Sequence, residues 1–273
     1  MIAGLVISDI SAKLNSDIST LITKLEVSWS MDGASQIRFS VHDESLQLLK
    51  NKYFQVRRAV TYEASEFEIA SLEVSQGESS TGLCTVEART RAVQLMKRDK
   101  KPSAYGGVSA TDYARMVADK FGLKFVGEPT SKKKAVIQTG TGTKQDSVWD
   151  VLQRSAQEAE FVTFESNGTL YFASQEWLLG KWANLTATYP SKDTDSLIFL
   201  EIPQCRRSED DPLSAEFKAV FERTNAKNLR PGMTIILAGM YEFDGKYLIT
   251  DIAYEEGIND PVGISARTVE KKT

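Results

Sequence analysis

The sequence predicts an α+β protein, mainly β, in which a small α/β module separates two β domains. Apolar and polar residues alternate with a period of two in residues 1–96 and again in residues 176–273, which is typical of half-buried antiparallel strands. Residues 97–175 instead contain two amphipathic patterns with helical spacing. We therefore expect domains at 1–96, 97–175 and 176–273, the first and last of them built mainly of β-strands.

The composition indicates an ordinary globular chain. Of its 273 residues, 41% are hydrophobic and 26% are charged, with a net charge of −4. An acidic balance disfavours a dedicated nucleic-acid binder, and apolar runs are too short to span a bilayer. Residues 1–7 are apolar but lack the positive region and cleavage site of a signal peptide, so they predict a first strand and synthesis in a cytoplasm.

The first β domain is predicted element by element. Strands at 25–31 and 37–41 flank an Asp-Gly turn and form a hairpin. A strand over 54–62 follows, after a short helical turn over 43–49. The apolar alternation then shifts phase between 67–69 and 72–74, which predicts a bulge of the kind that bends strands in a closed barrel. A last short strand covers 84–88.

The α/β module begins after a charged connector at 97–102. Ser109 begins a helix that Gly122 ends, with Asp112 favourably placed at the positive end of the helix dipole. Asp146 is the predicted N-cap of a second helix. The other expected elements are strands at 123–126 and 135–137 and a hairpin whose strands, 161–165 and 169–173, flank Asn167-Gly168.

The last β domain contains several short strands separated by turns, which favours a small barrel or sandwich. Alternation predicts strands at 215–221, 233–237, 248–254 and 262–268. Pro-Gly at 231–232 and Asp-Gly at 244–245 provide turns, whereas 204–213 reads as an exposed charged loop. The chain shows no internal sequence repeat.

Residues that usually carry chemistry are few. His42 is the one histidine and is expected to be solvated at a strand end, while Cys84 and Cys205 are expected to be small buried hydrophobes. A zinc site needs three or four ligands from His, Cys or carboxylates, which this set does not favour. We therefore predict no catalytic, cofactor-binding or metal-binding residues, and no cofactor.

Three weaker sequence patterns are explained without a functional site. The Gly-Thr-Gly-Thr-Lys run at 140–144 fails the spacing of a phosphate loop and reads as a flexible lead-in to the second helix. The adjacent carboxylates at 210–211 and 255–256 would point to opposite faces of a strand, so they do not form a glycosidase pair. Basic clusters at 97–101 and 132–134 read as solvated loops, although they could contact phosphates.

Two stretches resemble the hub proteins of bacteriophage tails and baseplates, including late control proteins and the hub part of type VI secretion spikes. The first, 108–176, has the family's order of helix, strand, helix with an aromatic residue and hairpin, ending in Gly-Thr-Leu-Tyr-Phe at 168–172. The second, 228–270, has a Pro-Gly turn followed by Gly-Lys-Tyr-Leu-Ile at 245–249. The order of β domain, α/β module and β domain is also similar.

The resemblance implies a structural virion protein and not an enzyme. It implies a homotrimer in which each chain contributes two tail-tube-like β-barrel domains, so that the ring adapts a sixfold tail tube to a threefold spike or fibre. Implied partners are a tail tube or distal tail protein, a spike or tail-fibre protein and a tape measure protein. DNA would pass through the channel without sequence-specific binding. The protein would be made in the bacterial host cytoplasm, enter the virion tail and not insert into membranes.

Two other functions compete with the hub. The chain could be a receptor- or carbohydrate-binding minor tail protein, in which exposed Trp177 and Trp182 stack on sugars. It could also be a tail-associated cell-wall hydrolase that uses some of its many carboxylates. Core or interface packing is the commoner fate of tryptophan, and no carboxylate pair is identifiable from sequence, so the hub is the favoured hypothesis.

Overall fold

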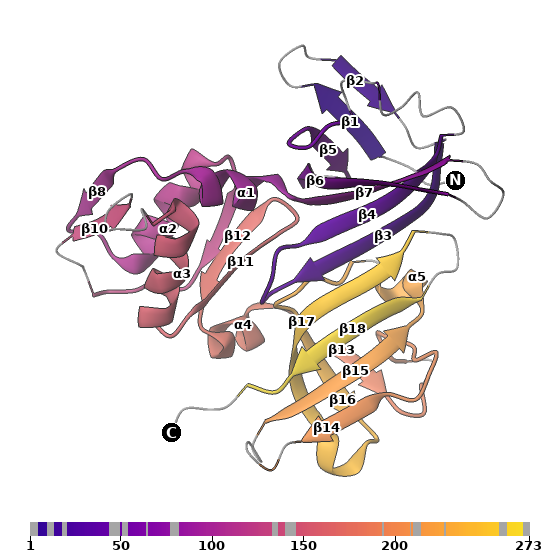
Figure 1. Ribbon diagram of the computed structural model, residues 1–273. Coiled ribbons are helices and arrows are strands. Elements are labelled where there is room, and N and C mark those ends of the chain that lie inside the picture. The colour runs from indigo at the N-terminus through magenta and orange to yellow at the C-terminus, as the bar shows by residue number, and fades with distance from the viewer. Residues whose placement is uncertain are drawn as a thin grey trace.

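The computed structural model contains one large sheet, two small sheets and five α-helices among its described residues. It describes the whole chain except residues 1–4, 10–13, 18–20, 44–49, 51–53, 64, 77–81, 133–135, 140–145, 193, 208, 210–213, 227, 257–260 and 270–273. The α+β, mainly β class predicted from the sequence is confirmed. In Figure 1 the α/β module lies to one side of a long sheet to which both ends of the chain contribute.

The N-terminal half of the large sheet runs in the order β3-β4-β7-β6-β5-β1-β2. Its strands are β1 (Leu5–Asp9), β2 (Leu14–Asp17), β3 (Ile22–Ser30), β4 (Gln36–His42), β5 (Ala59–Tyr62), β6 (Ser65–Gln76) and β7 (Gly82–Thr90). The predicted hairpin is β3–β4. The predicted bulge is confirmed, because the β6–β7 register skips Ala70 between Ile69 and Ser71.

Three predictions in this half need correction or lie outside the described residues. The strand expected over 54–62 covers only Ala59–Tyr62, because Arg57 has a positive φ of 73° and turns the chain just before it. Phe54 is nevertheless buried. The strand expected to be short, β7, is long and central, since it pairs with both β4 and β6. The helical turn expected over 43–49 falls largely on residues that are not described.

The α/β module spans α1 to α4. Its elements are α1 (Arg91–Arg98), β8 (Ser103–Gly106), α2 (Ala110–Lys120), β9 (Lys124–Gly127), β10 (Val136–Thr139), α3 (Val148–Glu158), β11 (Val162–Ser166), β12 (Thr169–Ala173) and α4 (Gln175–Lys181). Asn167 and Gly168 have positive φ values of 51° and 71°, as a two-residue hairpin turn requires. β12 also pairs in parallel with β9, which completes the three-stranded sheet β11-β12-β9.

Both long helices of the module begin with a capping box. Ser109 begins α2, as predicted from the sequence, and forms the capping box with Asp112. The cap of α3 is Ser147 with Asp150, not Asp146, which forms an ion pair with Arg154 instead. The charged connector expected at 97–102 is partly helical, because α1 extends through Arg98.

The C-terminal half completes the large sheet. It contains β13 (Leu185–Thr188), β14 (Gln204–Arg207), β15 (Ala215–Phe221), α5 (Arg223–Ala226), β16 (Thr234–Ala238), a 3₁₀ turn η3 (Tyr241–Phe243), β17 (Gly245–Glu255) and β18 (Val262–Arg267). The four predicted strands are found. The exposed loop expected at 204–213 is wrong in its first part, because Gln204–Arg207 pairs with β15 as an edge strand.

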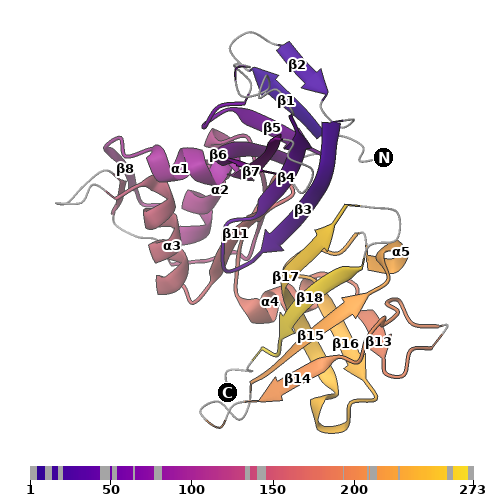
Figure 2. The ribbon, with the colours of Figure 1, turned by 45° about the vertical axis from the view of Figure 1, so that its right-hand side comes forward.

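One hydrophobic core extends across both halves, because β3 pairs antiparallel with β17. Trp29 on β3 lies opposite Ile252 on β17, and both are 1% exposed. The module has a core of its own around Tyr113, Leu152 and Phe172. A third cluster, which includes Met31, Phe164 and Leu248, joins the module to both halves of the sheet. Figure 2 shows β3 and β17 side by side where the two halves meet.

A candidate functional surface on the shared sheet

The two halves of the large sheet have the same architecture. The N-terminal order β3-β4-β7-β6-β5-β1 is matched by β14-β15-β18-β17-β16-β13 in the C-terminal half. Corresponding strands also follow one another in the same sequence order, with β1 before β3 and β13 before β14. Among the matched strand pairs of the described residues, the direction differs in one, because β1–β5 is antiparallel and β13–β16 is parallel.

The match extends to the register of individual residues. In the N-terminal half Ile69 pairs with Ala88, and the β6–β7 register then skips one residue. In the C-terminal half Ile249 pairs with Ala266, and the β17–β18 register skips one residue at the equivalent position, Thr250. After each bulge, the residue pairs of the two strands follow one another without a further shift in register. The chain therefore contains a structural repeat that the sequence did not reveal.

One face of the shared sheet is polar and hollowed. Its apolar residues point to the core, and the alternate residues of the same strands point away from it. A hollow of about 510 Å³ includes Glu26, Ser28 and Arg38, and one of about 320 Å³ includes Lys218 and Asp251. The first hollow lies at the joint of the two halves, and the second lies within the C-terminal half. This face is a candidate functional surface, here called the concave face.

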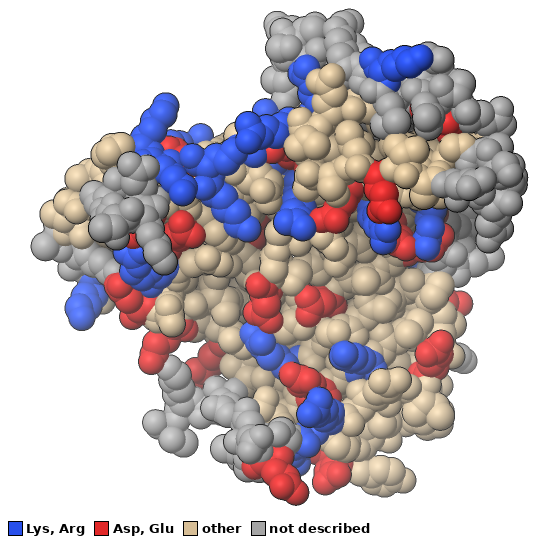
Figure 3. All heavy atoms as spheres, viewed as in Figure 1, with Lys and Arg blue, Asp and Glu red and all other residues tan. Residues whose placement is uncertain are grey.

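Charges of both signs alternate across the concave face. Glu26 on β3 lies opposite Arg38 on β4, which lies opposite Glu87 on β7. In the C-terminal half Glu216 on β15 lies between its register partners Arg206 and Arg267. Opposite charges on neighbouring strands attract each other and reduce the field that each would exert on a ligand. Figure 3 shows positive and negative side chains interspersed over the lower part of the sheet.

Salt bridges bind the joint of the two halves together. Lys24 on β3 contacts Glu255 on β17 at 3.3 Å and Glu26 at 2.7 Å, and these carboxylates raise the pKa of Lys24. Glu256 forms an ion pair with Arg223 and accepts a hydrogen bond from the Tyr62 hydroxyl at 2.6 Å. The adjacent carboxylates Glu255 and Glu256 thus have separate cationic partners, and the structure does not bring them together as a catalytic pair.

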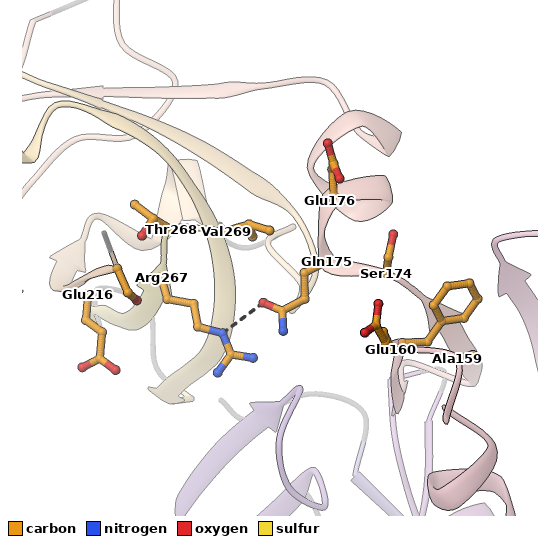
Figure 4. Close-up of a pocket in the computed structure, with 11 residues that line it drawn as sticks. Ala159, Glu160, Ser174, Gln175, Glu176, Glu216, Arg267, Thr268 and Val269 are labelled. Carbon is orange, nitrogen blue, oxygen red and sulfur yellow. Dashed lines mark hydrogen bonds between the residues drawn. The ribbon is translucent and has the colours of Figure 1, made fainter. Parts of the chain in front are cut away.

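A polar cavity lies between the module and the C-terminal half (Figure 4). It has a volume of about 520 Å³ and is lined by residues of the α3–β11 connection, α4 and β18. Arg267 donates a hydrogen bond from Nε to Gln175 at 3.3 Å, and its other nitrogens contact Asp32 at 3.1 and 3.3 Å. The guanidinium therefore connects the β3–β4 turn, the module and β18, and its contacts hold these parts of the fold together.

Residues singled out from the sequence lie apart from one another. His42 is exposed at the end of β4, as predicted. Cys84 is buried in the shared core, and Cys205 is half-buried on β14. Among the described residues, no group of three His, Cys, Asp or Glu side chains is arranged to hold a metal ion. Residues 140–145 and the carboxylates at 210–211 lie outside the described part of the chain.

The two tryptophans and the basic clusters are also placed. Trp177 and Trp182 are half-buried and pack against the third hydrophobic cluster, so they do not have the exposure that the carbohydrate-binding alternative requires. Arg98 forms an ion pair with the buried carboxylate of Glu68, so one member of the basic cluster at 97–101 has a structural role. Lysine and arginine side chains gather along this side of the module in Figure 3. Of the second cluster only Lys132 is described, and it is exposed.

No helix among the described residues is long and apolar enough to cross a membrane.

Comparison with known proteins shows similarity in structure. No family model and no curated protein matches the sequence. The 43 kDa tail protein of prophage MuSo2 from Shewanella oneidensis matches with a TM-score of 0.65 and 11% identity over 96% of both chains. The prophage tail protein gp18 from Listeria monocytogenes matches with a TM-score of 0.63 and 12% identity, over 99% of this chain and 96% of that one.

A third similar structure belongs to a secretion system. The c3393 protein of E. coli is described as a component of the type VI secretion system with structural similarity to the T4 phage tail proteins gp27 and gp5. It matches with a TM-score of 0.58 and 12% identity, over 90% of this chain and 73% of that one. Such low identities establish the fold and leave the function open. The resemblance to tail hub proteins predicted from the sequence is confirmed at the level of the fold, which this chain shares with phage tail proteins and a type VI secretion component.

Proposed function

We propose that this chain is the structural hub of a phage tail or of a related injection machine. In this role three copies form a ring that adapts a sixfold tail tube to a threefold spike or fibre. The observation that carries the proposal is the structural repeat within one continuous sheet. Because each chain contains two equivalent halves, three chains present six similar units on one side of a ring while the whole ring has threefold symmetry.

The concave face suits the lining of a channel for DNA. Proteins bind DNA non-specifically by neutralising phosphates with lysine and arginine. On this face several basic side chains have acidic register partners, as with Arg38 beside Glu26 and Glu87. Such a surface provides little net attraction for phosphates, so DNA can pass without being held. The module then remains for contacts with a tail tube or distal tail protein, a spike or fibre protein and a tape measure protein.

The same proposal places the protein in the virion tail after synthesis in the host cytoplasm, and it requires no catalysis. The three-domain division at 1–96, 97–175 and 176–273 and the closure of each β domain into a barrel stay predictions. The alternative of a carbohydrate-binding tail protein rested on exposed tryptophans, and Trp177 and Trp182 are instead half-buried. No structural observation favours a hydrolase over the hub.

The mass of the purified chain in solution tests the proposal. Light scattering over a range of concentrations, with and without the tail-tube and spike proteins of the same particle, should give the mass of three chains. Electron microscopy of that species should then show a ring with six similar lobes around its channel. A chain that stays monomeric at every concentration, even with those partners present, would contradict the hub function.

A further inference from the structure

Equivalent strands of the two halves have unequal neighbours. The first part of β17 pairs with β16, and its last part, Asp251–Glu255, pairs with β3. The first part of β6 pairs likewise with β5, but its last part, from Ser71 onward, pairs only with β7 among the described residues. The distal part of β6 thus has one open edge at the position where β17 has a partner strand.

The other end of the sheet has the complementary opening. β3 pairs with β4 on one side and with β17 on the other. Its equivalent β14 pairs with β15 on one side, and in the described part of the chain its other side has no strand. The internal joint of each copy is formed by β17 and β3. The equivalents of these strands, β6 and β14, each have an unpaired edge among the described residues. Unpaired strand edges readily add another strand.

The side chains of β6 also indicate a missing neighbour. Ile252 on β17 is 1% exposed because β3 covers it. Its equivalent on β6, Leu72, is only half-buried, and the next residue on the same face, Val74, is 45% exposed. These apolar side chains point to the core side of the sheet, so a strand added at this edge would bury them.

We propose, on the basis of the hub function above, that the distal part of β6 in one copy pairs antiparallel with β14 of a second copy in the register of the internal β17–β3 joint. That joint places Tyr254 opposite Val27 and Ala253 opposite Ser28. Val74 on β6 is equivalent to Tyr254, and Cys205 on β14 is equivalent to Val27. The same register therefore places Val74 opposite Cys205 and the preceding pair, Glu73 and Arg206, opposite each other.

The transferred register is physically consistent. Glu73 and Arg206 fall on the concave face and form a pair of opposite charge across the interface, and neither has an ion-pair partner among the described residues. Val74 meets the half-buried Cys205 on the core face. Because the two edges differ, the contact is head-to-tail, and repetition around a rotation axis closes a ring.

The native cysteine on β14 provides a direct test. Residues opposite each other in an antiparallel pair have Cβ atoms roughly 4.5–5.5 Å apart, close to disulfide geometry. Residue 74 also lies opposite Cys84 on β7 of the same chain, so the test is made in a Cys84→Ala background that removes an intrachain disulfide. In the Val74→Cys variant of this background, mild oxidation should join the new cysteine to Cys205 of the neighbouring copy. Denaturing gels without reductant should show bands of two and three chains and none larger, because a closed ring of three has no free edge.

Two matched controls give the register. In the same Cys84→Ala background, Val74→Cys combined with Cys205→Ser should remain a single-chain band, which shows that the cross-link requires Cys205. Ser75→Cys should cross-link far less, because Ser75 lies on the opposite face of the strand, across from Gln204. Charge reversal adds a second readout: Glu73→Arg and Arg206→Glu should each weaken association, and the double variant should restore it.

The outcomes separate this interface from the hub function. A trimeric mass without the Val74→Cys cross-link, and without an effect of either charge reversal, would overturn the interface and leave the hub function standing. A chain that neither associates nor cross-links at any concentration, with its tail partners present, would overturn both. Cross-linking of Ser75→Cys as strong as that of Val74→Cys would show that the register is wrong.

Discussion

At the scale of single residues, Glu165 is the most unusual ionisable group. It lies on β11, is 5% exposed and accepts a hydrogen bond from the Gly168 backbone at 2.8 Å. Burial raises the pKa of its carboxyl from 4.5 to about 7. The surrounding hairpin tip contacts the N-terminal half, since Ser35 donates to the Glu165 carbonyl at 3.3 Å and Ser65 donates to the Asn167 side chain at 3.0 Å.

We predict that Glu165→Gln removes a pH dependence of stability. The folded pKa is raised, so below pH 4.5 the carboxyl is protonated in both states and its stabilising contribution is fully present. As the pH rises from 4.5 through about 7, the unfolded chain releases the proton first and stability is lost. The uncharged amide avoids this loss, and the advantage of the variant should reach on the order of 3 kcal/mol.

The measurement is urea denaturation of both proteins at pH 5 and pH 8. The difference in unfolding free energy between variant and wild type isolates this carboxyl from the other groups that titrate. The variant should gain relative to wild type as the pH rises. A difference that is the same at both pH values would show that the carboxyl titrates as it does in water.

At the scale of elements, strands and helices with strong local signals follow from the sequence. Alternation predicted the β3–β4 hairpin, and the phase shift after Ile69 predicted the β6 bulge. Elements without such signals were missed: α1 is a short, charged helix, and β14 is a polar edge strand of four residues. Their conformation depends on tertiary contacts, such as the ion pair of Arg98 with Glu68 and the pairing of β14 with β15.

The start of α3 provides a test at this scale. The Ser147 hydroxyl accepts from the Asp150 backbone at 3.2 Å, and the Ser147 backbone donates to the Asp150 carboxylate at 2.9 Å. Ser147→Ala should therefore cost about 1 kcal/mol of stability. Asp146→Ala removes only an ion pair with the half-exposed Arg154 and should cost less than about 0.5 kcal/mol.

Hydrogen exchange of the α3 amides and urea denaturation measure both effects. The two positions are adjacent, so the pair of variants controls for general disturbance of this turn. If Asp146→Ala proved the more damaging change, Asp146 would be the functional cap and the hydrogen bonds of Ser147 would contribute little.

At the scale of the whole molecule, the sequence predicted the order of parts but not how they join. Its alternating patterns identified which residues face a core, and therefore most residues of the concave face. Two facts need three-dimensional information: β3 pairs with β17, far away in the chain, and the two halves repeat the same register. The repeat preserves pairing geometry rather than residue identity, as Phe39 and Ala219 at equivalent positions illustrate.

The shared core has a consequence for how the chain unfolds. Ile37 in the N-terminal half and Ile264 in the C-terminal half belong to one cluster, while Val151 belongs to the separate core of the module. Elements that share a core open together, and separate cores can open independently. Ile37→Val and Ile264→Val should each lower the opening free energy of amides in both halves by about 0.5–1.5 kcal/mol.

Native-state hydrogen exchange measures these opening free energies amide by amide, with Val151→Ala as the comparison. That variant should lower the protection of amides in α2 and α3 against exchange. It should lower the protection of amides in β4 and β18 less. If Ile37→Val affected only the N-terminal half, the two halves would be independent folding units that meet at β3 and β17. The joint would then have to be stabilised by ring assembly, whereas a coupled response means that each chain carries a rigid pair of units into the ring.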